Sequence, residues 1–271
     1  MINFTEAQLE RYSRHIILKD VGVEGQAKIM SGKVLIIGAG GLGSPAALYL
    51  AAAGVGTIGI VDSDTVELSN LQRQIIHFTK DLYTPKATSA AEKMEALNPE
   101  VTIKTYYTFV SADNIRGIIR EYDFVIDGTD NFAAKFLIND ACVMEGIPFS
   151  HGGILRFNGQ TMTVLPEESA CLRCVFEEPP PRDAVPTCAQ AGVLGSIAGL
   201  LGTIQTSEAL KFLTGAGTLL TDSMLFFDIL TMEFIKHKLG KNRECGLCGE
   251  APTIQELIDE QQPVCDLRPT C

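Results

Sequence analysis

The sequence predicts an α/β fold of the Rossmann-like, doubly wound type, with a mainly parallel sheet and antiparallel strands near its C-terminal end. Residues 33–62 read as a strand, a glycine-rich turn, a helix and a second strand, which is the order of a βαβ unit. A buried strand at 124–126 precedes a helix expected at 133–145, so the alternation continues. Closing strands, expected at 224–229 and 232–238, complete the antiparallel part.

The first turn carries Gly38, Gly40 and Gly43 in the spacing G-x-G-x-x-G, and the strand after its helix ends on Asp62. In such units the glycines permit a tight turn, a close approach of backbone to phosphate, and close packing of helix on sheet. The helix N-terminus then faces an anion, and the acid is placed to accept ribose hydroxyls. The pattern favours nucleotide binding over a turn that only packs. It does not decide which nucleotide binds, and NAD is the usual occupant.

A polar, turn-prone segment follows Asp62 and carries Asp64, Asn70, Arg73 and Lys86. A dehydrogenase of this fold normally continues into ordinary strands and helices at this point. Two cations close to a phosphate-binding turn suit a triphosphate and a leaving pyrophosphate, which carry more charge than a dinucleotide. The alternative is that both cations are surface charges, and the residues alone leave the two interpretations open.

Two acids, Asp127 and Asp130, follow the strand at 124–126. Open α/β sheets bind ligands at the carboxyl ends of their strands, so we expect both acids at the edge of the nucleotide pocket. Asp130 alternatively caps the next helix, and the spacing does not separate that role from metal or phosphate chemistry. His151 is expected to be a structural histidine, because the sequence offers it no evident partner.

The other elements are expected from periodicity and turn residues. A helix at 5–18 begins with a capping box formed by Thr5 and Gln8, and residues 19–32 connect it to the first strand. The dipeptide Asn158-Gly159 between alternating runs predicts the turn of a β-hairpin. The remaining expected elements are helices at 87–97, 112–121 and 189–213, a strand at 101–107, and a short helix from 253 to about 260.

Cys171 and Cys174 form a C-x-x-C pair that is matched far downstream by Cys245 and Cys248. Four thiolates complete a closed, tetrahedral zinc site of the structural kind, and free thiols or a redox pair are the alternatives. Such a metal would connect the segment around residues 171–174 to the C-terminal end of its domain. We expect that domain to span residues 1–248, followed by a tail at 249–271.

The proline-rich segment at 177–188 predicts an extended crossover that delivers Cys188 to the start of a helix. A thiolate is favoured at a helix N-terminus, so Cys188 is a candidate nucleophile. The alternative is a small buried residue at a helix start. The sequence assigns no role to Cys142, Cys265 or Cys271.

Composition excludes several classes of partner. The 271 residues carry a net charge of −11 without runs of like charge, which argues against nucleic acid, because phosphate neutralisation needs a basic face. No uninterrupted apolar stretch of membrane-spanning length occurs, and the N-terminus is too charged for a signal peptide. We therefore expect no membrane partner and a cytoplasmic location, where eight cysteines point to metal or catalysis.

Several segments together resemble the MoeB/ThiF/HesA family, bacterial relatives of the ubiquitin-activating enzymes. They are GAGGLGS, VDSDTVELSNLQRQIIH, TPKA, DGTDN, PTC before AGV, and the two C-x-x-C pairs, and the resemblance runs from about residue 12 to 248. It implies that ATP and Mg²⁺ are used to adenylate the C-terminal glycine of a small ubiquitin-like sulfur-carrier protein ending in Gly-Gly, with release of pyrophosphate. The adenylate would then accept sulfur, giving a thiocarboxylate for molybdopterin or thiazole synthesis.

The resemblance also implies roles for single residues in the nucleotide site. Gly41 would lie against the phosphates, Asp62 would hold the ribose, and Asp130 would position magnesium. The implied triphosphate-binding group is Asn70, Arg73 and Lys86.

Other implied roles concern assembly and sulfur. Arg14 resembles an arginine that reaches into the partner subunit's site, which implies a homodimer. Cys188 matches a cysteine that carries an acyl or persulfide intermediate in some relatives. The implied zinc ligands are Cys171, Cys174, Cys245 and Cys248. The tail contains no rhodanese-sized domain, so a separate sulfur donor is expected.

Other classes of function remain as alternatives. An NAD-dependent oxidoreductase on the same fold would not require Arg73, Lys86 and Asp130 around its pocket. Adenylation of a small-molecule carboxylate and a non-catalytic binding scaffold are further possibilities. ATP–pyrophosphate exchange stimulated by a diglycine-tailed carrier separates these classes.

Overall fold

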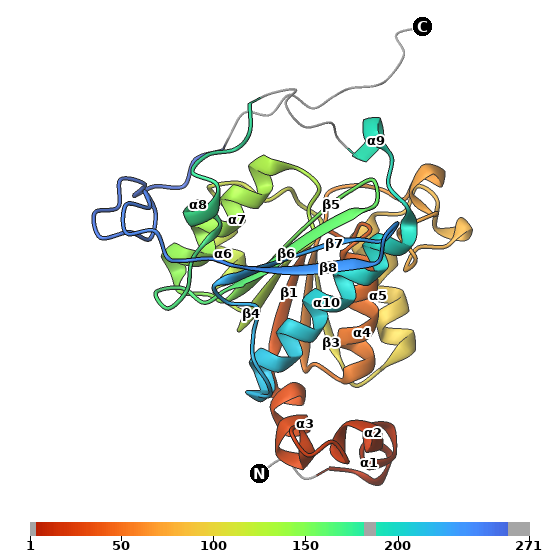
Figure 1. Ribbon diagram of the computed structural model, residues 1–271. Coiled ribbons are helices and arrows are strands. Elements are labelled where there is room, and N and C mark those ends of the chain that lie inside the picture. The colour runs from red at the N-terminus through yellow and green to blue at the C-terminus, as the bar shows by residue number, and fades with distance from the viewer. Residues whose placement is uncertain (1–3, 182–187, 260–271) are drawn as a thin grey trace, which may run out of the picture.

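The computed structural model describes residues 4–181 and 188–259, and its strands form an eight-stranded sheet in the order β3-β2-β1-β4-β5-β6-β7-β8. β3, β2, β1, β4 and β5 run parallel, whereas β6, β7 and β8 each lie antiparallel to the strand before (Figure 1). The strands are β1 Lys33–Ile37, β2 Thr57–Val61, β3 Thr102–Tyr106, β4 Phe124–Asp127, β5 Phe149–Leu155, β6 Asn158–Val164, β7 Ser223–Asp228 and β8 Glu233–Lys238. The predicted fold class, including its antiparallel end, is confirmed.

Helices cover both faces of the parallel part. Within the described residues they are α1 Glu6–Arg11, α2 Ser13–Ile16, α3 Gly22–Ser31, α4 Gly43–Ala53, α5 Lys86–Leu97, α6 Ile115–Ile119, α7 Phe132–Glu145, α8 Leu172–Val175, α9 Cys188–Ala191 and α10 Gly195–Thr214. Two short 3₁₀ turns, η1 Leu68–Asn70 and η2 Thr79–Asp81, lie between β2 and α5.

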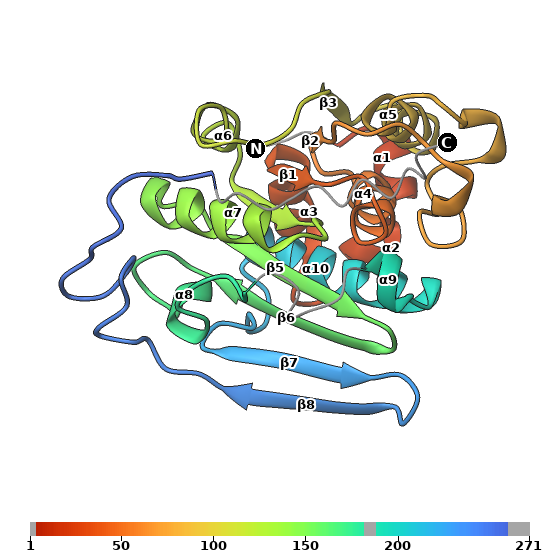
Figure 2. The ribbon, with the colours of Figure 1, turned by 90° about the horizontal axis from the view of Figure 1, so that it is seen from above.

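Alternation along the strands divides the core into two layers. Val34 and Ile36 of β1 pack in one buried cluster with α4, α5 and α10. Leu35 and Ile37 of the same strand pack in the other, with α6 and α7. Figure 2 shows α7 and α4 on opposite sides of the sheet. A strand buried on both faces needs apolar residues at every position, which is why the run at 34–37 does not alternate.

The N-terminal segment differs from its prediction. Its capping box is present, but the expected helix at 5–18 is divided into α1 and α2 at Tyr12. The Tyr12 side chain is buried, and its hydroxyl accepts a hydrogen bond from Asn98 Nδ2 at 2.9 Å, so tertiary packing turns the chain there. The predicted connector at 19–32 instead contains α3, which buries Gln26 and Ile29 despite its two low-propensity glycines.

The hairpin between β5 and β6 turns two residues earlier than predicted. Leu155 pairs with Asn158, so the turn is formed by Arg156 and Phe157, and Arg156 has a φ of 55°. Gly159 belongs to β6, where a Cβ atom would lie 2.2 Å from the ring of Phe227. The glycine therefore serves cross-strand packing rather than the turn.

The long helix predicted at 189–213 is interrupted. α9 ends at Ala191, Gly192 has a φ of 77°, and α10 begins at Gly195. Between the helices, Arg156 N–H donates to the Gly192 carbonyl and Leu194 N–H donates to the Arg156 carbonyl. Pairing with the hairpin turn thus replaces helical hydrogen bonds at 192–194.

The short helix predicted from residue 253 is absent from the described part of the tail, residues 249–259. The amides of Thr253 and Ile254 both donate to the Gly246 carbonyl, and Asp259 Oδ1 accepts from the Ala112 amide at 2.8 Å. Ile254 and Leu257 pack against the core. The last residues of the predicted helix lie outside the described residues.

Candidate functional site

A cleft of about 840 Å³ lies at the carboxyl ends of the first parallel strands. It gathers most of the residues predicted to bind a nucleotide, although they are spread over the first half of the chain. Those that line it are Gly38, Gly40, Gly41, Asp62, Asp64, Arg73, Lys86 and Asp130. Asn70 lines a smaller adjoining hollow of about 340 Å³, which it shares with Asp64 and Lys86. Asp127, predicted at this edge, is not among the lining residues.

The glycine turn is shaped by close backbone contacts. Gly38 has a φ of 101°, and a Cβ atom there would lie 2.7 Å from the Gly128 carbonyl oxygen. A Cβ atom at Gly43 would lie 1.8 Å from the Gly38 carbonyl oxygen. These two positions therefore admit only glycine, which accounts for the packing role of the motif. At Gly40, which lines the cleft, such a Cβ would make only an ordinary contact, 3.6 Å from Gln74 Nε2, so packing does not require that glycine.

Asp62 is oriented by backbone amides from both directions. Its Oδ2 accepts from the Ala39 N–H at 2.8 Å, and its Oδ1 accepts from the Asp64 N–H at 2.8 Å. Burial raises the pKa of Asp62, and the positive charge of Lys86 opposes that effect. Each oxygen retains accepting capacity, so the carboxylate can receive hydroxyl donors from a ligand in the cleft.

Two cations stand on the cleft wall. Lys86, the first residue of α5, has a side chain only 7% exposed, and its Nζ lies 2.8 Å from Oδ2 of the exposed Asp64. Arg73 donates from Nη1 to the Ser69 carbonyl at 3.0 Å, and its aliphatic stem lies beside Gly41. Lys86 therefore lines the cleft with its ammonium in an ion pair whose carboxylate is exposed.

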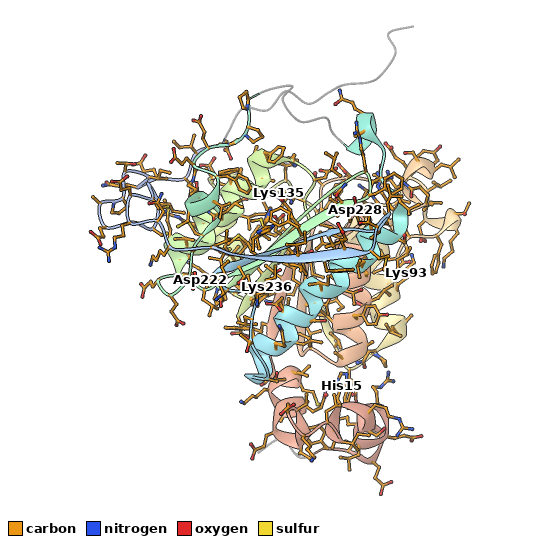
Figure 3. All side chains as sticks on the ribbon, viewed as in Figure 1. His15, Lys93, Lys135, Asp222, Asp228 and Lys236 are labelled. Atoms are coloured by element: carbon orange, nitrogen blue, oxygen red, sulfur yellow. The ribbon has the colours of Figure 1, made fainter. Side chains whose placement is uncertain are left out.

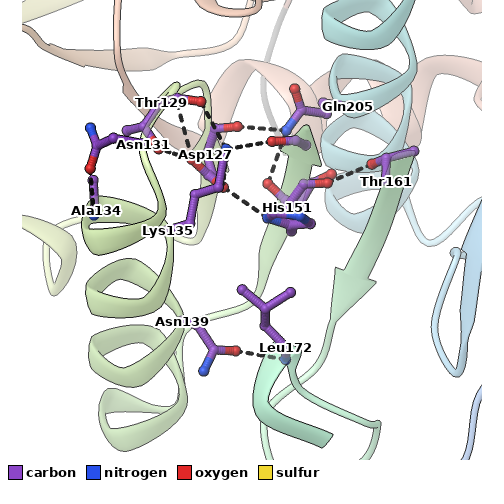
Figure 4. A network of polar contacts seen from close by, with 12 residues as sticks. Asp127, Thr129, Asn131, Ala134, Lys135, Asn139, His151, Thr161, Leu172 and Gln205 are labelled. Atoms are coloured by element: carbon purple, nitrogen blue, oxygen red, sulfur yellow. Dashed lines mark hydrogen bonds and ion pairs between the residues drawn. The ribbon is translucent and has the colours of Figure 1, made fainter. Parts of the chain in front are cut away.

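The loop after β4 resolves the alternatives for Asp130. Asn131, not Asp130, caps α7, because its Oδ1 accepts from the Ala134 N–H at 2.8 Å (Figure 4). Asp130 is exposed and lines the cleft. The capping interpretation is therefore wrong, and the carboxylate is available to a ligand or metal.

Asp127 lies behind the cleft wall in a buried network (Figure 4). Its carboxylate accepts from Lys135 Nζ at 3.1 and 3.3 Å and pairs with His151 Nδ1 at 3.0 Å. Burial alone would raise the pKa of Asp127, but the charge of Lys135 and the bond to His151 lower it below its usual range. The expectation that Asp127 edges the pocket is wrong for its own side chain, because its partners Lys135 and His151 line the cleft in its place.

His151, for which the sequence predicted a structural role, is buried and pairs with Asp127, a partner that the sequence did not reveal. It also lines the cleft, and its buried Nε2 has no hydrogen-bond partner among the described residues, so the structural role stays a prediction. Burial lowers the pKa of His151, so the ring is neutral and Nδ1–H donates to Asp127. Lys135 was missed as well. A lysine within the apolar run FAAKFLIN signals a buried charge in need of a partner, but the sequence does not say which.

The two C-x-x-C pairs come together as predicted. The four sulfur atoms all lie within 4.8 Å of one another, with pairs at 3.4–3.9 Å. Tetrahedral Zn–S bonds of about 2.3 Å require sulfur–sulfur distances of about 3.8 Å, so the cluster fits zinc. The hydrogen bond between Cys171 and Cys248 lowers the pKa of Cys248 and raises that of Cys171, so a thiolate in the cluster is favoured at Cys248. The sulfur cluster joins α8 to the segment at 245–248.

Among the predicted catalytic residues, Arg14 does not line the cleft in this chain. Arg14 is exposed on α2, and the N-terminal helices lie at the end of the molecule opposite α9 (Figure 1). Its neighbour His15 is likewise far from Lys135 (Figure 3). Cys188 begins α9, but its side chain lies outside the described residues. Within the described residues, no helix is both long and apolar enough to cross a bilayer.

The fold and the cleft define a doubly wound α/β protein with a glycine-rich turn and two cations on the cleft, and with a separate cluster of four thiols. The sequence matches the ThiF family over residues 12–247, and the chain belongs to that family.

Two relatives agree with this, and a solved structure has the same fold. The chain is 45% identical over 249 residues to the SAMP-activating enzyme E1 of Haloferax volcanii, covering 92% of both. It is 42% identical over 272 residues to the sulfur carrier protein adenylyltransferase of Thermus thermophilus, covering 98% of this chain and 100% of that one. A crystal structure of E. coli MccB superimposes with a TM-score of 0.80 at 20% identity, covering 91% of this chain and 76% of that one, and shows the same fold.

Proposed function

We propose that this chain is an ATP-dependent adenylyltransferase that acts on the C-terminal glycine carboxylate of a small ubiquitin-like sulfur-carrier protein. The observation that carries the proposal is the convergence of the glycine turn, Asp62, Arg73, Lys86 and Asp130 on one cleft. The names of the Thermus and Haloferax relatives supply the class of partner. An oxidoreductase would not require the two cations, and no observation favours that alternative.

The reaction brings together two anions, a carboxylate and a phosphate, so the residues of the cleft must offset their repulsion. A carboxylate oxygen forms a bond to the α-phosphorus, the bond from that phosphorus to the bridging oxygen breaks, and the electron pair leaves with pyrophosphate. Arg73 and Lys86 offset the repulsion on approach and the charge on the leaving group. Asp62 holds the ribose, and the amides of Gly40 and Gly41 bind phosphate oxygens.

Magnesium and zinc would bind at different sites and have different roles. Mg²⁺ would neutralise phosphate charge when bound, and Asp130 is the exposed carboxylate of the cleft that suits an oxygen-preferring cation. Zn²⁺ would be held by Cys171, Cys174, Cys245 and Cys248, where the closed set of thiolates leaves no position for substrate. We therefore assign zinc a structural role.

Assembly and the sulfur step complete the proposal. Arg14, which is exposed and away from its own cleft, would complete the site of a second copy, which makes the enzyme a homodimer. Cys188 would act after adenylation, when sulfur from a separate donor attacks the adenylate. We place these reactions in the cytoplasm, in one domain at 1–248 with a tail at 249–271.

ATP–pyrophosphate exchange tests the proposal. We expect exchange that requires a carrier ending in Gly-Gly and Mg²⁺, and none with the same carrier lacking its last glycine. Exchange stimulated by a small carboxylic acid without any carrier would contradict the proposed substrate. Binding of NAD but not ATP would contradict the class of reaction.

A further inference from the structure

His77 is a buried polar residue beside the cleft to which the mechanism gives no part. It follows the polar segment after β2 and is only 3% exposed. Its Nε2 lies 2.9 Å from the Ala39 carbonyl oxygen, in the glycine turn, and its Nδ1 lies 2.9 Å from Ser89 Oγ, on α5. The ring therefore connects the glycine turn to the helix that carries Lys86.

The partners determine which nitrogen carries the proton. A carbonyl oxygen can only accept, so Nε2–H donates to Ala39. Burial lowers the pKa of His77, so the ring is neutral and Nδ1 accepts from the Ser89 hydroxyl. Ser89 Oγ in turn accepts from Lys93 Nζ at 3.0 Å. The ring is thus held at both nitrogens and has one orientation.

The residue that His77 binds is itself held at both ends. The Ala39 N–H donates to Asp62 Oδ2 at 2.8 Å, while the Ala39 carbonyl accepts from His77. No peptide bond among the described residues is cis, and in a planar trans peptide the carbonyl and the next N–H point in opposite directions. The bond from His77 therefore turns the Gly40 N–H away from the ring. Among the described residues, neither Gly40 nor Gly41 donates its amide to another protein atom, and both residues line the cleft.

We propose that His77 is a positioning residue for the nucleotide. By fixing the Ala39–Gly40 peptide it aims the Gly40 amide at the phosphates, and through Ala39 it also fixes the carboxylate of Asp62. This inference rests on the proposed function, since it assumes that ATP binds against the glycine turn. His77 touches no reacting atom, so its effect falls on nucleotide affinity rather than on turnover.

Two substitutions of His77 test whether the donor to the Ala39 carbonyl matters, or only the presence of a polar side chain. In His77→Gln the amide nitrogen occupies roughly the place of Nε2 and can still donate to Ala39. In His77→Asn the shorter side chain reaches only the place of Nδ1, so Ala39 loses its donor. Thr163→Val is the matched control, because it removes a buried hydrogen bond, from Thr163 Oγ1 to Glu208 Oε2 at 2.6 Å, at a residue that does not line the cleft.

The measurements are the Kd for Mg-ATP by calorimetry, the KM for ATP and kcat in exchange, and the melting temperature. We expect His77→Asn to raise Kd and KM about tenfold at nearly unchanged kcat, the effect of one misdirected hydrogen bond to a charged ligand. His77→Gln should restore most of the affinity. Thr163→Val should lower the melting temperature without changing Kd. If His77→Asn does not fold, His77→Met, which has similar bulk but no donor for the Ala39 carbonyl, should raise Kd in a folded protein.

The outcomes are distinguishable from failure of the proposed function. A wild-type protein that binds no ATP would overturn that function and this inference together. Wild-type binding with an unchanged Kd in His77→Asn, or in His77→Met, would overturn only the role of His77. Equal losses of affinity in His77→Gln and His77→Asn would also overturn it, because the donor to Ala39 would then be irrelevant.

Discussion

Lys135 Nζ lies 3.1 Å from Asp127 Oδ2, and both side chains are almost completely buried. The same ammonium donates to the Thr129 carbonyl at 2.8 Å and to the Gly152 carbonyl, so it connects the loop that carries Asp130 to β5. Asp127 also binds that loop, because its Oδ1 accepts from both the amide and the hydroxyl of Thr129. The backbone that precedes Asp130 is therefore fixed by one buried ion pair.

Lys135→Met should destabilise the fold by about 3–5 kcal/mol, because it leaves a buried carboxylate without its charge partner. Urea unfolding of the single variants and of the double variant Lys135→Met/Asp127→Asn measures the coupling. We expect the double variant to lose less than the sum of the single losses, since the neutral amide that replaces the carboxylate no longer needs a cation. Strictly additive losses would show that the two residues are not coupled.

Stability should fall as the pH drops below about 6.5, the ordinary value for histidine. The folded-state pKa values of His77 and His151 are lowered by burial, so the unfolded chain takes up these protons first and is favoured by acid. Each histidine lowers the free energy of unfolding by at most about 1.4 kcal/mol for each pH unit of acidification. The lowered pKa of Asp127 adds a further loss below about pH 4, when the unfolded-state carboxyl begins to protonate.

Guanidinium unfolding at pH 7.5 and 5.5 tests the histidine effect. His151→Asn keeps a donor near the position of Nδ1 but cannot titrate, so its stability should depend less on pH than that of the wild type. The same pH dependence in both proteins would mean that His151 is not buried neutral.

The protein should contain about one zinc ion per chain, measurable by elemental analysis, and Cys248→Ser should lose it. With zinc at about 1,000 times its Kd, binding stabilises the fold by about 4 kcal/mol, so chelation should lower the melting temperature. Cys142→Ala is the control, because Cys142 is buried in α7 outside the cluster. Retention of zinc by Cys248→Ser would contradict the assignment of ligands.

Arg14→Ala should reduce exchange on the order of 10³-fold without unfolding the chain, if Arg14 acts in a partner's site as an arginine finger does. Lys86→Ala should also be inactive. Mixing the two variants should restore about a quarter of wild-type activity, since half of the dimers are mixed and each has one intact site. Full activity of Arg14→Ala alone, or no recovery on mixing, would exclude a shared site.

The sequence predicted best those features that are determined by residues close together in the chain. The βαβ unit was predicted almost to the residue, because the apolar runs, Gly38 and Gly43 each obey short-range constraints. The cysteine cluster was predicted because the residue type and spacing of the two C-x-x-C pairs indicate a metal site.

Features that depend on contacts between distant segments could not be predicted in this way. α3 forms in a glycine-containing stretch because Gln26 donates to the Ala53 carbonyl at 2.9 Å. The hairpin turn shifts because Gly159 must pass the ring of Phe227. The partners of His77 and Lys135 lie on other elements, so the sequence showed these residues without showing what they bind.

Transfer of label from ATP to the carrier tests the central claim most directly. The purified enzyme is incubated with Mg-ATP and a diglycine-tailed carrier, in parallel with the phosphorus label at the α or the γ position. We predict that α-label becomes attached to the carrier while γ-label is released as pyrophosphate, and that Arg73→Ala gives neither. Attachment of γ-label to the carrier, or consumption of ATP with an unlabelled carrier in both experiments, would contradict the account.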